Sequence, residues 1–339
     1  MSVRIVTQSE VPALLPMKDC VEVMNGVLAT LARGDAVLPL RTMMWLPDRS
    51  GLLGLMPACL GSPAVMGLKV VSVMPGNHGT EYESHQGAVL IFDVTHGRLL
   101  AVIDASSITA IRTAAVSGLA TRLLARADAG DLAILGSGVQ AASHLDAMRA
   151  VRSLRRVRVW SRNAGNARAF AERESVRHGV LVEPVASARA AVEGADLVCT
   201  TTASKVPILE GAWLSPGVHI NAVGACFRDA RELDTVAVAG SKLYVDRRES
   251  ALNEAGDFLL AKAEGAFGDD HIVGELGEVL IGAAPGRRSP EERTLFESLG
   301  IAVEDLAAAH HIWRQAEARD SGTALDFGGR RETAERVTR

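Results

Sequence analysis

A glycine-rich turn near the middle of the chain constrains the fold more than any other feature of the sequence. The hexapeptide GSGVQA at 136–141 directly follows the apolar run 131–135 and directly precedes a stretch with helical spacing of apolar residues. In a strand–turn–helix unit of this kind, the first glycine makes the turn, the second lets a pyrophosphate approach the backbone, and the small sixth residue lets the helix pack closely. The motif in this context predicts a dinucleotide site, and the alternative is a tight turn in a helix-covered sheet.

Strand and helix patterns continue to alternate on the C-terminal side of this turn. Further apolar, β-rich runs follow at intervals, namely RRVRVW, VLVEPV, ADLVCTTT, GVHINAVG and SKLYVD. Such alternation is typical of a parallel sheet with helices on both faces. The sequence therefore predicts an α/β fold with a Rossmann-type doubly wound parallel sheet.

The N-terminal third carries a different pattern. Residues 16–33 have the apolar spacing of a helix, and short β-rich runs follow at 41–46, 52–56, 65–71, 88–94 and 99–103. These runs predict a mostly antiparallel sheet. A helix capped by Ser106 or Ser107 and extending to about residue 125 is expected to join the two domains. Residues 303–318 again have helical spacing, and the polar last twenty residues are expected to be loosely ordered.

The composition excludes several classes of protein. With 339 residues, 48% of them hydrophobic, the chain is long enough for two domains with sizeable cores. The formal net charge of −4 provides no long-range attraction for polyanions, so we expect no nucleic-acid partner. The histidines lack the spacing of metal ligands, and we expect no metal site.

Cysteine usage and the first residues bear on the cellular compartment. Four cysteines lie far apart without CxxC spacing, which predicts reduced thiols (Cys20, Cys59, Cys199 and Cys226). The N-terminus lacks the apolar segment of a signal peptide, and the longest uncharged run near it is too rich in Gly and Pro to span a bilayer. These features predict a soluble, cytoplasmic protein with no membrane partner.

The end of the second strand in the alternating region determines which dinucleotide fits. An NAD site uses a carboxylate there to bind the ribose hydroxyls, but the chain reads Ser161-Arg162-Asn163. Ser161 can donate a hydrogen bond to a 2′-phosphate, and Arg162 can pair with it through its planar fork of donors. These residues favour NADP(H), with NAD(H) possible. The alternative is that Arg162 is an ordinary solvated charge near a helix start.

Seven stretches resemble the ornithine cyclodeaminase and mu-crystallin family. They run from about residue 38 to 310 and read LRTMMWLPDRSGLLGLMPA, MGLKVVSV, ESHQGAVLIFD, ITAIRTAAVSGLATRLLA, LAILGSGVQA, INAVGA and FESLGIAVEDLAAA. The IRTAA run followed some twenty residues later by LGSGVQA is quite specific to that family. The resemblance covers most of the chain.

The resemblance implies a particular domain organisation. Its members have an N-terminal α+β dimerisation and substrate domain, an inserted Rossmann domain, and a C-terminal helix that returns to the first domain. We therefore expect residues 1–120 plus 305–339 to bind substrate and form a homodimer, and residues 121–304 to bind the cofactor. The β-rich apolar runs of the first domain also exceed what one small sheet could bury, which favours the dimer.

The resemblance also implies site residues. Arg41, Lys69 and Arg112 match the family's substrate-binding cations, and Ser84 matches a nearby hydroxyl position. Thr113 and the segment 221–224 match positions beside the nicotinamide. The expected cofactor contacts are then Thr113, Gly136, Ser137, Gly138, Val139, Gln140, Ser161, Arg162, Asn163, Thr201 and Val223.

The chemistry of the cations points the same way. A substrate carboxylate needs two or three converging cations, and we expect Lys69 and Arg112 to be catalytic residues. Burial lowers the pKa of a lysine, so Lys69 can also protonate an imine nitrogen, directly or through a water. His85 is an alternative proton shuttle. Taken singly, each charge has the plainer interpretation of a solvated or paired surface residue.

Two positions depart from the cyclodeaminase pattern. Ornithine-specific members carry a Glu before the Pro of the ELMP-type segment and an Asp shortly after the NAVG segment, whereas these expected substrate contacts are Met56 and Cys226 here. Neither side chain can bind an ammonium group. Met56, Cys226 and the Ser161-Arg162 pair therefore favour a reductase over a lyase.

These observations lead to a specific hypothesis. We expect an NADPH-dependent reductase of amino-acid metabolism that converts a small cyclic α-imino acid, of the Δ1-pyrroline-2-carboxylate or Δ1-piperideine-2-carboxylate type, to the L-amino acid. The alternatives are an ornithine or lysine cyclodeaminase, an alanine dehydrogenase-like enzyme that performs reductive amination, and a crystallin-like protein that binds NADPH without catalysis.

Overall fold

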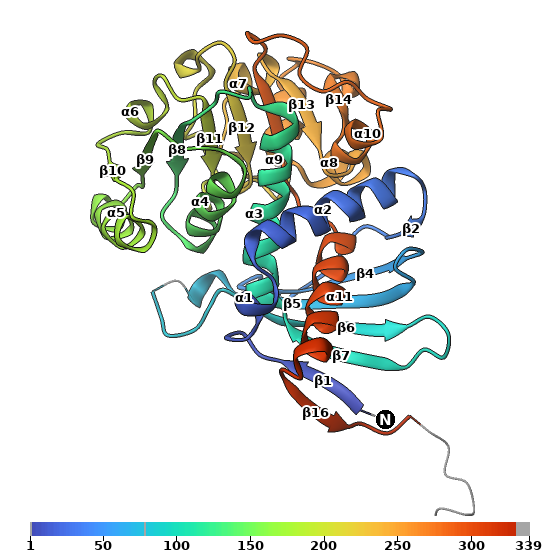
Figure 1. Cartoon of the computed structure of the whole chain (residues 1–339). Coiled ribbons are helices and arrows are strands. Elements are labelled where there is room, and N and C mark those ends of the chain that lie inside the picture. The colour runs from blue at the N-terminus through green and yellow to red at the C-terminus, as the bar shows by residue number, and fades with distance from the viewer. Residues whose placement is uncertain (1, 78, 330–339) are drawn as a thin grey trace, which may run out of the picture. The chain divides into compact units, whose positions relative to one another are not determined.

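The structure of the chain, a computed structural model, describes residues 2–77 and 79–329 (Figure 1). It consists of two compact units. The N-terminal unit comprises Met1–Pro16, Gly34–Thr109 and Ala302–Arg339, and the Rossmann unit comprises Met17–Arg33 and Ala110–Ile301. Within the described residues, no helix is both long enough and apolar enough to cross a membrane.

An eight-stranded sheet forms the body of the N-terminal unit. Its order is β16-β1-β7-β6-β5-β4-β2, and β3 pairs with β4. All neighbours are antiparallel except β1 and β7, which run parallel. The strands are β1 (Ser2–Val6), β2 (Ala36–Val37), β3 (Thr42–Trp45), β4 (Leu52–Leu60), β5 (Val65–Val73), β6 (His85–Asp93), β7 (Leu99–Asp104) and β16 (Thr323–Asp326).

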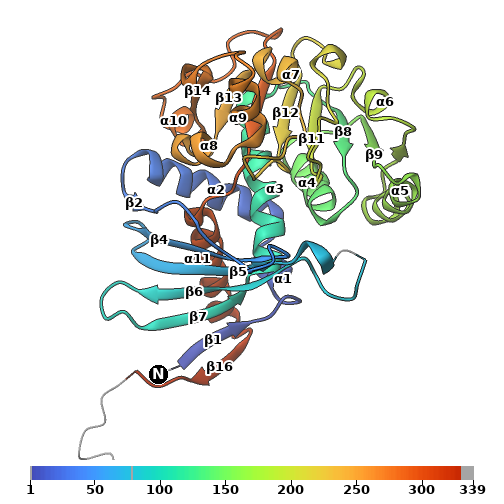
Figure 2. The ribbon, with the colours of Figure 1, turned by 180° about the vertical axis from the view of Figure 1, so that it is seen from behind.

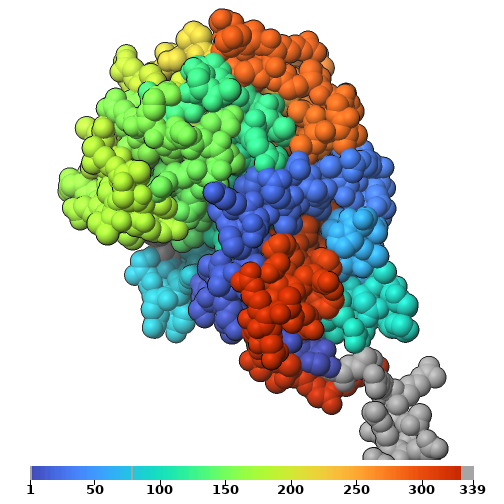
Figure 3. All heavy atoms as spheres, in the orientation of Figure 1, coloured from blue at the N-terminus to red at the C-terminus, as the bar shows by residue number. Residues whose placement is uncertain are grey.

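Helix α11 (Ala302–Arg319) packs on one face of this sheet, as Figures 1 and 2 show from opposite sides. Its first half is almost entirely buried, whereas the outer side of its second half is exposed and forms part of the surface in Figure 3. The helix approaches the sheet closely at Gly67, where a Cβ would lie 2.6 Å from Cδ1 of Leu306. The short helix α1 (Val11–Leu14) packs against α11.

The sheet of the Rossmann unit is entirely parallel. Its order is β10-β9-β8-β11-β12-β15-β13-β14. The strand order reverses between β8 and β11, and ligands of doubly wound sheets bind at the carboxyl ends of the strands at such a point. The strands are β8 (Asp131–Leu135), β9 (Arg156–Trp160), β10 (Val182–Pro184), β11 (Leu197–Thr200), β12 (His219–Ala222), β13 (Lys242–Val245), β14 (Ile272–Glu275) and β15 (Thr294–Glu297).

Helices of this unit enclose two apolar cores, one of which includes Leu145 and Phe170 and the other Leu243 and Phe258. The longer helices are α2 (Met17–Ala32), α3 (Ala105–Leu124), α4 (Val139–Val151) and α5 (Ala164–His178). The shorter ones are α6 (Ala188–Val192), α7 (Thr235–Ala239), α8 (Arg248–Glu254), α9 (Gly256–Ala263) and α10 (Leu276–Leu280). Single 3-10 turns complete the two units at Pro75–Asn77, Gly211–Trp213 and Asp269–His271.

The structure confirms the α/β fold with a doubly wound parallel sheet and differs from the sequence-based prediction in detail. The helix α3 starts at Ala105, and the side chain of Asp104, rather than Ser106 or Ser107, accepts the hydrogen bond from the backbone N–H of Ser107. The strands β1, β2, β14, β15 and β16 are absent from the sequence-based prediction, and β14 lies in the region 249–281, where the sequence predicts helix. Strand β16 lies within the last twenty residues, of which 330–339 are outside the described residues.

The division into units also differs from the predicted domains, 1–120 plus 305–339 and 121–304. Helix α2 belongs with the Rossmann unit because it packs against α10 and α4. Its contact with α10 is close, since Gly277 lies against the backbone of Leu28. The boundary predicted after residue 120 lies instead after Thr109, within α3, because the rest of that helix packs in the Rossmann unit.

Candidate functional site

The turn between β8 and α4 has the geometry that a bound dinucleotide requires. Gly136 has φ +127°, and a Cβ there would lie 2.5 Å from Oγ1 of Thr201, so only glycine fits. Gly138 is the N-cap of α4, which has no side-chain cap, and no atom lies within 4 Å of where its Cβ would be. The second glycine therefore leaves open space before a helix N-terminus, whose N–H groups and dipole attract phosphate. The residues of this turn fit a dinucleotide.

The parallel pairing of β8 and β9 brings Ser137 and Ser161 together. Leu135 pairs with Trp160, and the two serine hydroxyls just beyond these residues lie 3.1 Å apart. Asn163 caps helix α5 by accepting a hydrogen bond from the backbone N–H of Gly165 at 2.8 Å. Arg162 is exposed at this edge. Asn163 thus has a structural role in addition to its predicted cofactor contact.

The ends of β11 and β12 are held together by a buried glutamate that sequence reasoning missed. Glu232 accepts hydrogen bonds from the backbone N–H and the hydroxyl of Thr202, both at 2.6 Å, and from the backbone N–H of Gly224 at 2.7 Å. Burial raises the pKa of Glu232, and the bonds from Thr202 and Gly224 oppose that shift. The loops that carry the predicted contacts Thr201 and Val223 are therefore fixed by one carboxyl group.

Cys226 and Thr113 also belong to the Rossmann unit. The Cys226 thiol is half-buried and donates to the backbone carbonyl of Val223 at 3.2 Å. This contact supports a packing role for the thiol. Thr113 is buried in α3, next to Arg112 in sequence.

Arg112 is a buried cation whose guanidinium lies against the backbone of Gly300. A Cβ at Gly300 would lie 2.6 Å from Nη2 of Arg112, and Gly300 has φ +72°. The loop is held by Asp246, whose Oδ2 accepts the backbone N–H groups of Leu299 at 2.8 Å and Gly300 at 2.6 Å. A residue with a Cβ at position 300 would displace the Arg112 guanidinium, so glycine at this position allows Arg112 its observed place.

Lys69 is the buried cation of the N-terminal unit. It lies on β5, with Met56 of β4 and Val89 of β6 as its cross-strand neighbours. Its Nζ donates to Oδ1 of Asp305 at 3.0 Å, and the side chains are 4% and 0% exposed. A charged pair that is almost free of solvent contact is uncommon in a core. The strand register thus places the predicted Met56 and Lys69 side by side.

His85 begins β6 on the strand next to Lys69. Partial burial lowers the pKa of His85, the positive charge of Lys69 lowers it further, and Glu83 opposes the shift. The imidazole is therefore neutral near pH 7 and suited to accept a proton rather than donate one. Ser84, directly before it, is half-buried, and its carbonyl accepts the backbone N–H of Met74. Arg41 is half-buried just before β3.

Three further carboxyl groups of the Rossmann unit are buried, and none of them was a predicted site residue (Asp246, Asp257 and Glu297). Burial and the negative charge of Glu232 raise the pKa of Asp257 to about 7. Burial, together with the charges of Asp257 and Asp246, raises the pKa of Glu297 well above its usual range. Within the described residues, no group of three or more His, Cys, Asp and Glu side chains is arranged to hold a metal ion. Asp257 and Glu297 therefore bind their protons more tightly than ordinary carboxyl groups do.

A signal for one of the missed residues was present in the sequence. Glu304 and Asp305 interrupt an otherwise apolar run between Ala302 and Ala309. Acidic side chains in an apolar stretch of helix are usually buried only when they pair with a cation or accept hydrogen bonds, so both positions predict such partners. The partner of Asp305 is 236 positions away in the chain, so the sequence could not identify it.

The fold and the glycine-rich turn define a class of α/β protein whose parallel sheet fits a dinucleotide at the point where the strand order reverses. The chain belongs to the ornithine cyclodeaminase/mu-crystallin family, whose model matches residues 1–320. The resemblance seen in the sequence is thereby confirmed.

Several proteins similar to this chain are reductases by name. The chain is 45% identical over 293 residues to the ketimine reductase mu-crystallin of Mus musculus, covering 86% of this chain and 90% of that protein. It is 34% identical over 324 residues to a Δ1-pyrroline-2-carboxylate reductase of Bacillus cereus, covering 95% of this chain and 99% of that protein. Its structure matches that of Thermococcus litoralis Δ1-pyrroline-2-carboxylate reductase in complex with NADH and L-proline, with a TM-score of 0.93, 37% identity and coverage of 95% and 100%.

Proposed function

We propose that the chain is an NADPH-dependent reductase of small cyclic α-imino acids, of the Δ1-pyrroline-2-carboxylate or Δ1-piperideine-2-carboxylate type, that forms the L-amino acid. The names of the similar proteins support this reaction class. The observation that carries the proposal is the pairing of the buried Lys69 with Met56 on the neighbouring strand. A cation next to an apolar side chain suits a substrate with a carboxylate and an apolar ring.

The chain's own residues bind and orient the substrate in this proposal. Lys69 binds the imino acid carboxylate, because a buried cation gains most from an anionic partner. Arg112 stays a predicted substrate-binding residue. Lys69, or a water that it holds, protonates the ring nitrogen, which makes the neighbouring carbon a better hydride acceptor. The bound nicotinamide supplies the hydride, and the protein supplies orientation and electrostatics.

The preference for NADPH rests on the end of β9. The exposed Arg162 and the Ser161 hydroxyl, which lies 3.1 Å from that of Ser137, can bind a 2′-phosphate. A carboxylate in that place would instead bind the free ribose hydroxyls of NAD. A similar reductase structure contains NADH. The preference for NADPH over NADH is therefore proposed from Ser161 and Arg162 and not from the similar proteins.

A reductase activity is favoured over cyclodeamination by two side chains. Met56 is buried and apolar, and the Cys226 thiol already donates to the Val223 carbonyl. Neither offers a carboxylate to bind the amino group that a cyclodeaminase releases as ammonia. The two candidate activities therefore call for different side chains at these positions.

A direct assay separates the activities. The purified chain is mixed with NADPH and Δ1-pyrroline-2-carboxylate or Δ1-piperideine-2-carboxylate, and separately with NAD and ornithine or lysine. We expect loss of NADPH and formation of L-proline or L-pipecolate in the first mixture, and little ammonia in the second. Ammonia release at a rate comparable to imine reduction would overturn the proposal, and turnover in neither mixture would leave only a binding protein.

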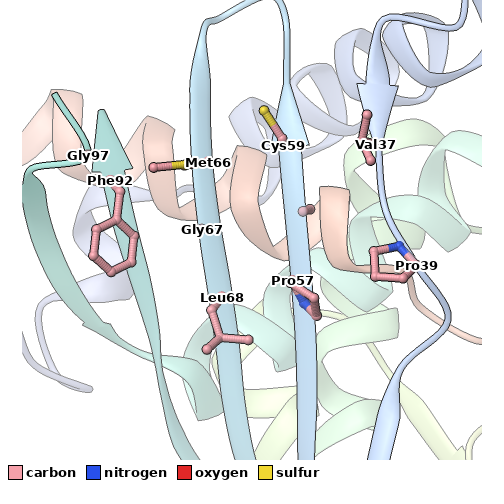
Figure 4. Close-up of a pocket in the computed structure, with 10 residues that line it drawn as sticks. Val37, Pro39, Pro57, Cys59, Met66, Gly67, Leu68, Phe92 and Gly97 are labelled. Carbon is pink, nitrogen blue, oxygen red and sulfur yellow. The ribbon is translucent and has the colours of Figure 1, made fainter. Parts of the chain in front are cut away.

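We also propose that the N-terminal unit forms a homodimer. The face of its sheet opposite α11 carries half-exposed apolar side chains from adjacent strands, which Figure 4 shows on one side of the sheet with the helix behind it (Pro57, Cys59, Met66, Leu68 and Phe92). A contiguous apolar face of this kind marks an interaction surface. Sedimentation at micromolar concentration is expected to show a dimer, and Leu68→Glu, which adds a charge to that face, is expected to shift it towards monomer. A stable wild-type monomer contradicts this proposal.

A further inference from the structure

The pairing of Lys69 with Asp305 joins two segments of the N-terminal unit that are 236 positions apart in the sequence. Lys69 lies on a central strand, and Asp305 lies in the first turn of α11. Gly67 and Lys69 are two positions apart on β5 and therefore face the same side of the sheet. Leu306 packs on that face at Gly67, so the helix turn that carries Asp305 is held against the strand that carries Lys69. The carboxylate has a fixed position at 3.0 Å from the amine.

The charge of Lys69 depends on this neighbour. Burial alone disfavours an ammonium ion, and buried lysines without an anion are neutral near pH 7. A carboxylate at hydrogen-bond distance favours the charged form. The other side chains next to Lys69 on the sheet, Met56 and Val89, are apolar. The titratable groups nearest to it in sequence on the elements packed around it are Glu83, just before β6, His85 at the start of β6, and Glu304 on α11. These elements carry further titratable groups at positions more distant from Lys69 and Asp305, namely Asp93 on β6 and His310, His311, Arg314, Glu317 and Arg319 on α11.

Both roles assigned to Lys69 require its proton. An amine without that proton cannot attract a carboxylate, and it cannot protonate a ring nitrogen. We propose that Asp305 is a positioning residue. It keeps Lys69 protonated and holds the Lys69 amine where it can bind the carboxylate of the imino acid and protonate the ring nitrogen. Asp305 acts through Lys69 in this assignment. The assignment builds on the proposed function, but the state of the lysine can be measured without any turnover.

The lysine content of the chain makes this measurement practical. The sequence has only five lysines, at positions 18, 69, 205, 242 and 262, and the structure places Lys69 alone among them in the buried class. Lysine labelled with ¹³C at the ε carbon therefore gives few NMR signals, and Lys69→Met assigns the signal of Lys69. The test follows that signal between about pH 6 and pH 9, where an ordinary lysine stays protonated.

We expect the Lys69 signal of the wild type to stay in its protonated form across this range, and that of Asp305→Asn to titrate within it. Asp305→Glu, which keeps the charge, is expected to restore the wild-type behaviour. Glu317→Gln is the matched control, because it removes another carboxylate of α11 that pairs with a cation, Arg4. It should leave the Lys69 signal unchanged. Identical titration of Lys69 in the wild type and Asp305→Asn would overturn the assignment.

Kinetics provide a second readout. For Asp305→Asn, kcat/KM for the imino acid is expected to fall with rising pH by at least tenfold relative to the wild type, and to recover towards low pH as Lys69 regains its proton. A structural defect alone would lower the activity equally at each pH. In the Lys69→Met background, Asp305→Asn should cause no further loss of kcat/KM, whereas an independent role of Asp305 would cause one.

The assignment remains testable if Asp305→Asn fails to fold. The double variant Lys69→Met, Asp305→Leu replaces the buried pair with apolar side chains of similar size, which proteins often tolerate. We expect its Tm to exceed that of Lys69→Met alone, which leaves a buried carboxylate without its cation. A double variant less stable than Lys69→Met would contradict the coupling. A wild type that reduces no imino acid would refute the proposed function, while the NMR result would still decide the role of Asp305.

Discussion

The candidate sites of the two units are built from different parts of the chain, one from backbone and the other from side chains. In the Rossmann unit, the dinucleotide turn consists of backbone: Gly136 has a conformation that requires glycine, and Gly138 leaves the helix N-terminus open. In the N-terminal unit, Lys69 depends on a side chain from a distant helix, Asp305. A backbone site is encoded in a few adjacent residues, whereas a side-chain site is encoded in residues that only the fold brings together.

This difference predicts that substitutions in the N-terminal unit affect chemistry, and those at the dinucleotide turn affect cofactor affinity. The largest effect is expected for Lys69→Met, which removes a charge and a proton source while roughly keeping volume. We expect kcat to fall by about 10²-fold or more, the usual contribution of general acid–base catalysis, with KM for the imino acid raised as well. Steady-state kinetics measure both, and fluorescence titration should show unchanged NADPH affinity. Near wild-type turnover would remove Lys69 from the mechanism and leave Ser84 or solvent as the proton source.

Arg112 tests whether a cation of the Rossmann unit also serves the substrate. Arg112→Ala removes binding that is present in both ground and transition states, so it should mainly raise KM. A charge-assisted hydrogen bond contributes about 1.5–3 kcal/mol, which corresponds to roughly a 10- to 100-fold increase. Arg112→Lys, which keeps the charge and loses the planar fork, is the matched control and should be affected less. A change in kcat without one in KM would assign Arg112 a different role.

The cofactor preference is the next effect in size. Arg162→Ala should weaken NADPH binding by roughly 10- to 100-fold through the loss of one charge-assisted bond to phosphate. NADH binding should change little, because NADH lacks that phosphate. Gly138→Ala is the matched comparison: its Cβ meets no protein atom, so the Tm should be kept while both cofactors bind more weakly. Equal losses of NADPH and NADH in Arg162→Ala would refute the NADP preference.

More of the Rossmann unit than of the N-terminal unit could be predicted from the sequence, because the features of the Rossmann unit are encoded in residues adjacent in the chain. The turn at 136–141 and the alternation after it depend on local periodicity, so the parallel sheet could be predicted from the residues. Lys69 and Met56 came from a family resemblance, and their adjacency follows from the pairing of β4 with β5, which apolar runs do not specify. Strands β1 and β16 join the sheet only through its edge, which requires both ends of the chain to meet.

The smallest expected effect concerns the buried acids of the Rossmann unit, whose protonation makes the stability of the fold depend on pH. Asp257 has a pKa raised from 3.8 to about 7, so the folded state binds its proton more tightly than the unfolded state does. The free energy of unfolding should therefore fall as pH rises from about 4 to about 7 and stay lower above that range.

Asp257→Asn should reduce this dependence. The amide oxygen can still accept the backbone N–H groups of Glu232 and Leu233, which donate to Oδ1 of Asp257 at 2.8 Å each. Because the carboxyl group of Asp257 ionises above its raised pKa and the amide of asparagine does not ionise, we expect the Tm of the variant to exceed that of the wild type at pH 8 and to match it near pH 4. Thermal melts across this range measure the difference. A variant less stable than the wild type at pH 8 would mean that the charged carboxylate of Asp257 stabilises the fold. Asp257 would then resemble Asp305, whose charged carboxylate makes a favourable contact with Lys69 in the other unit.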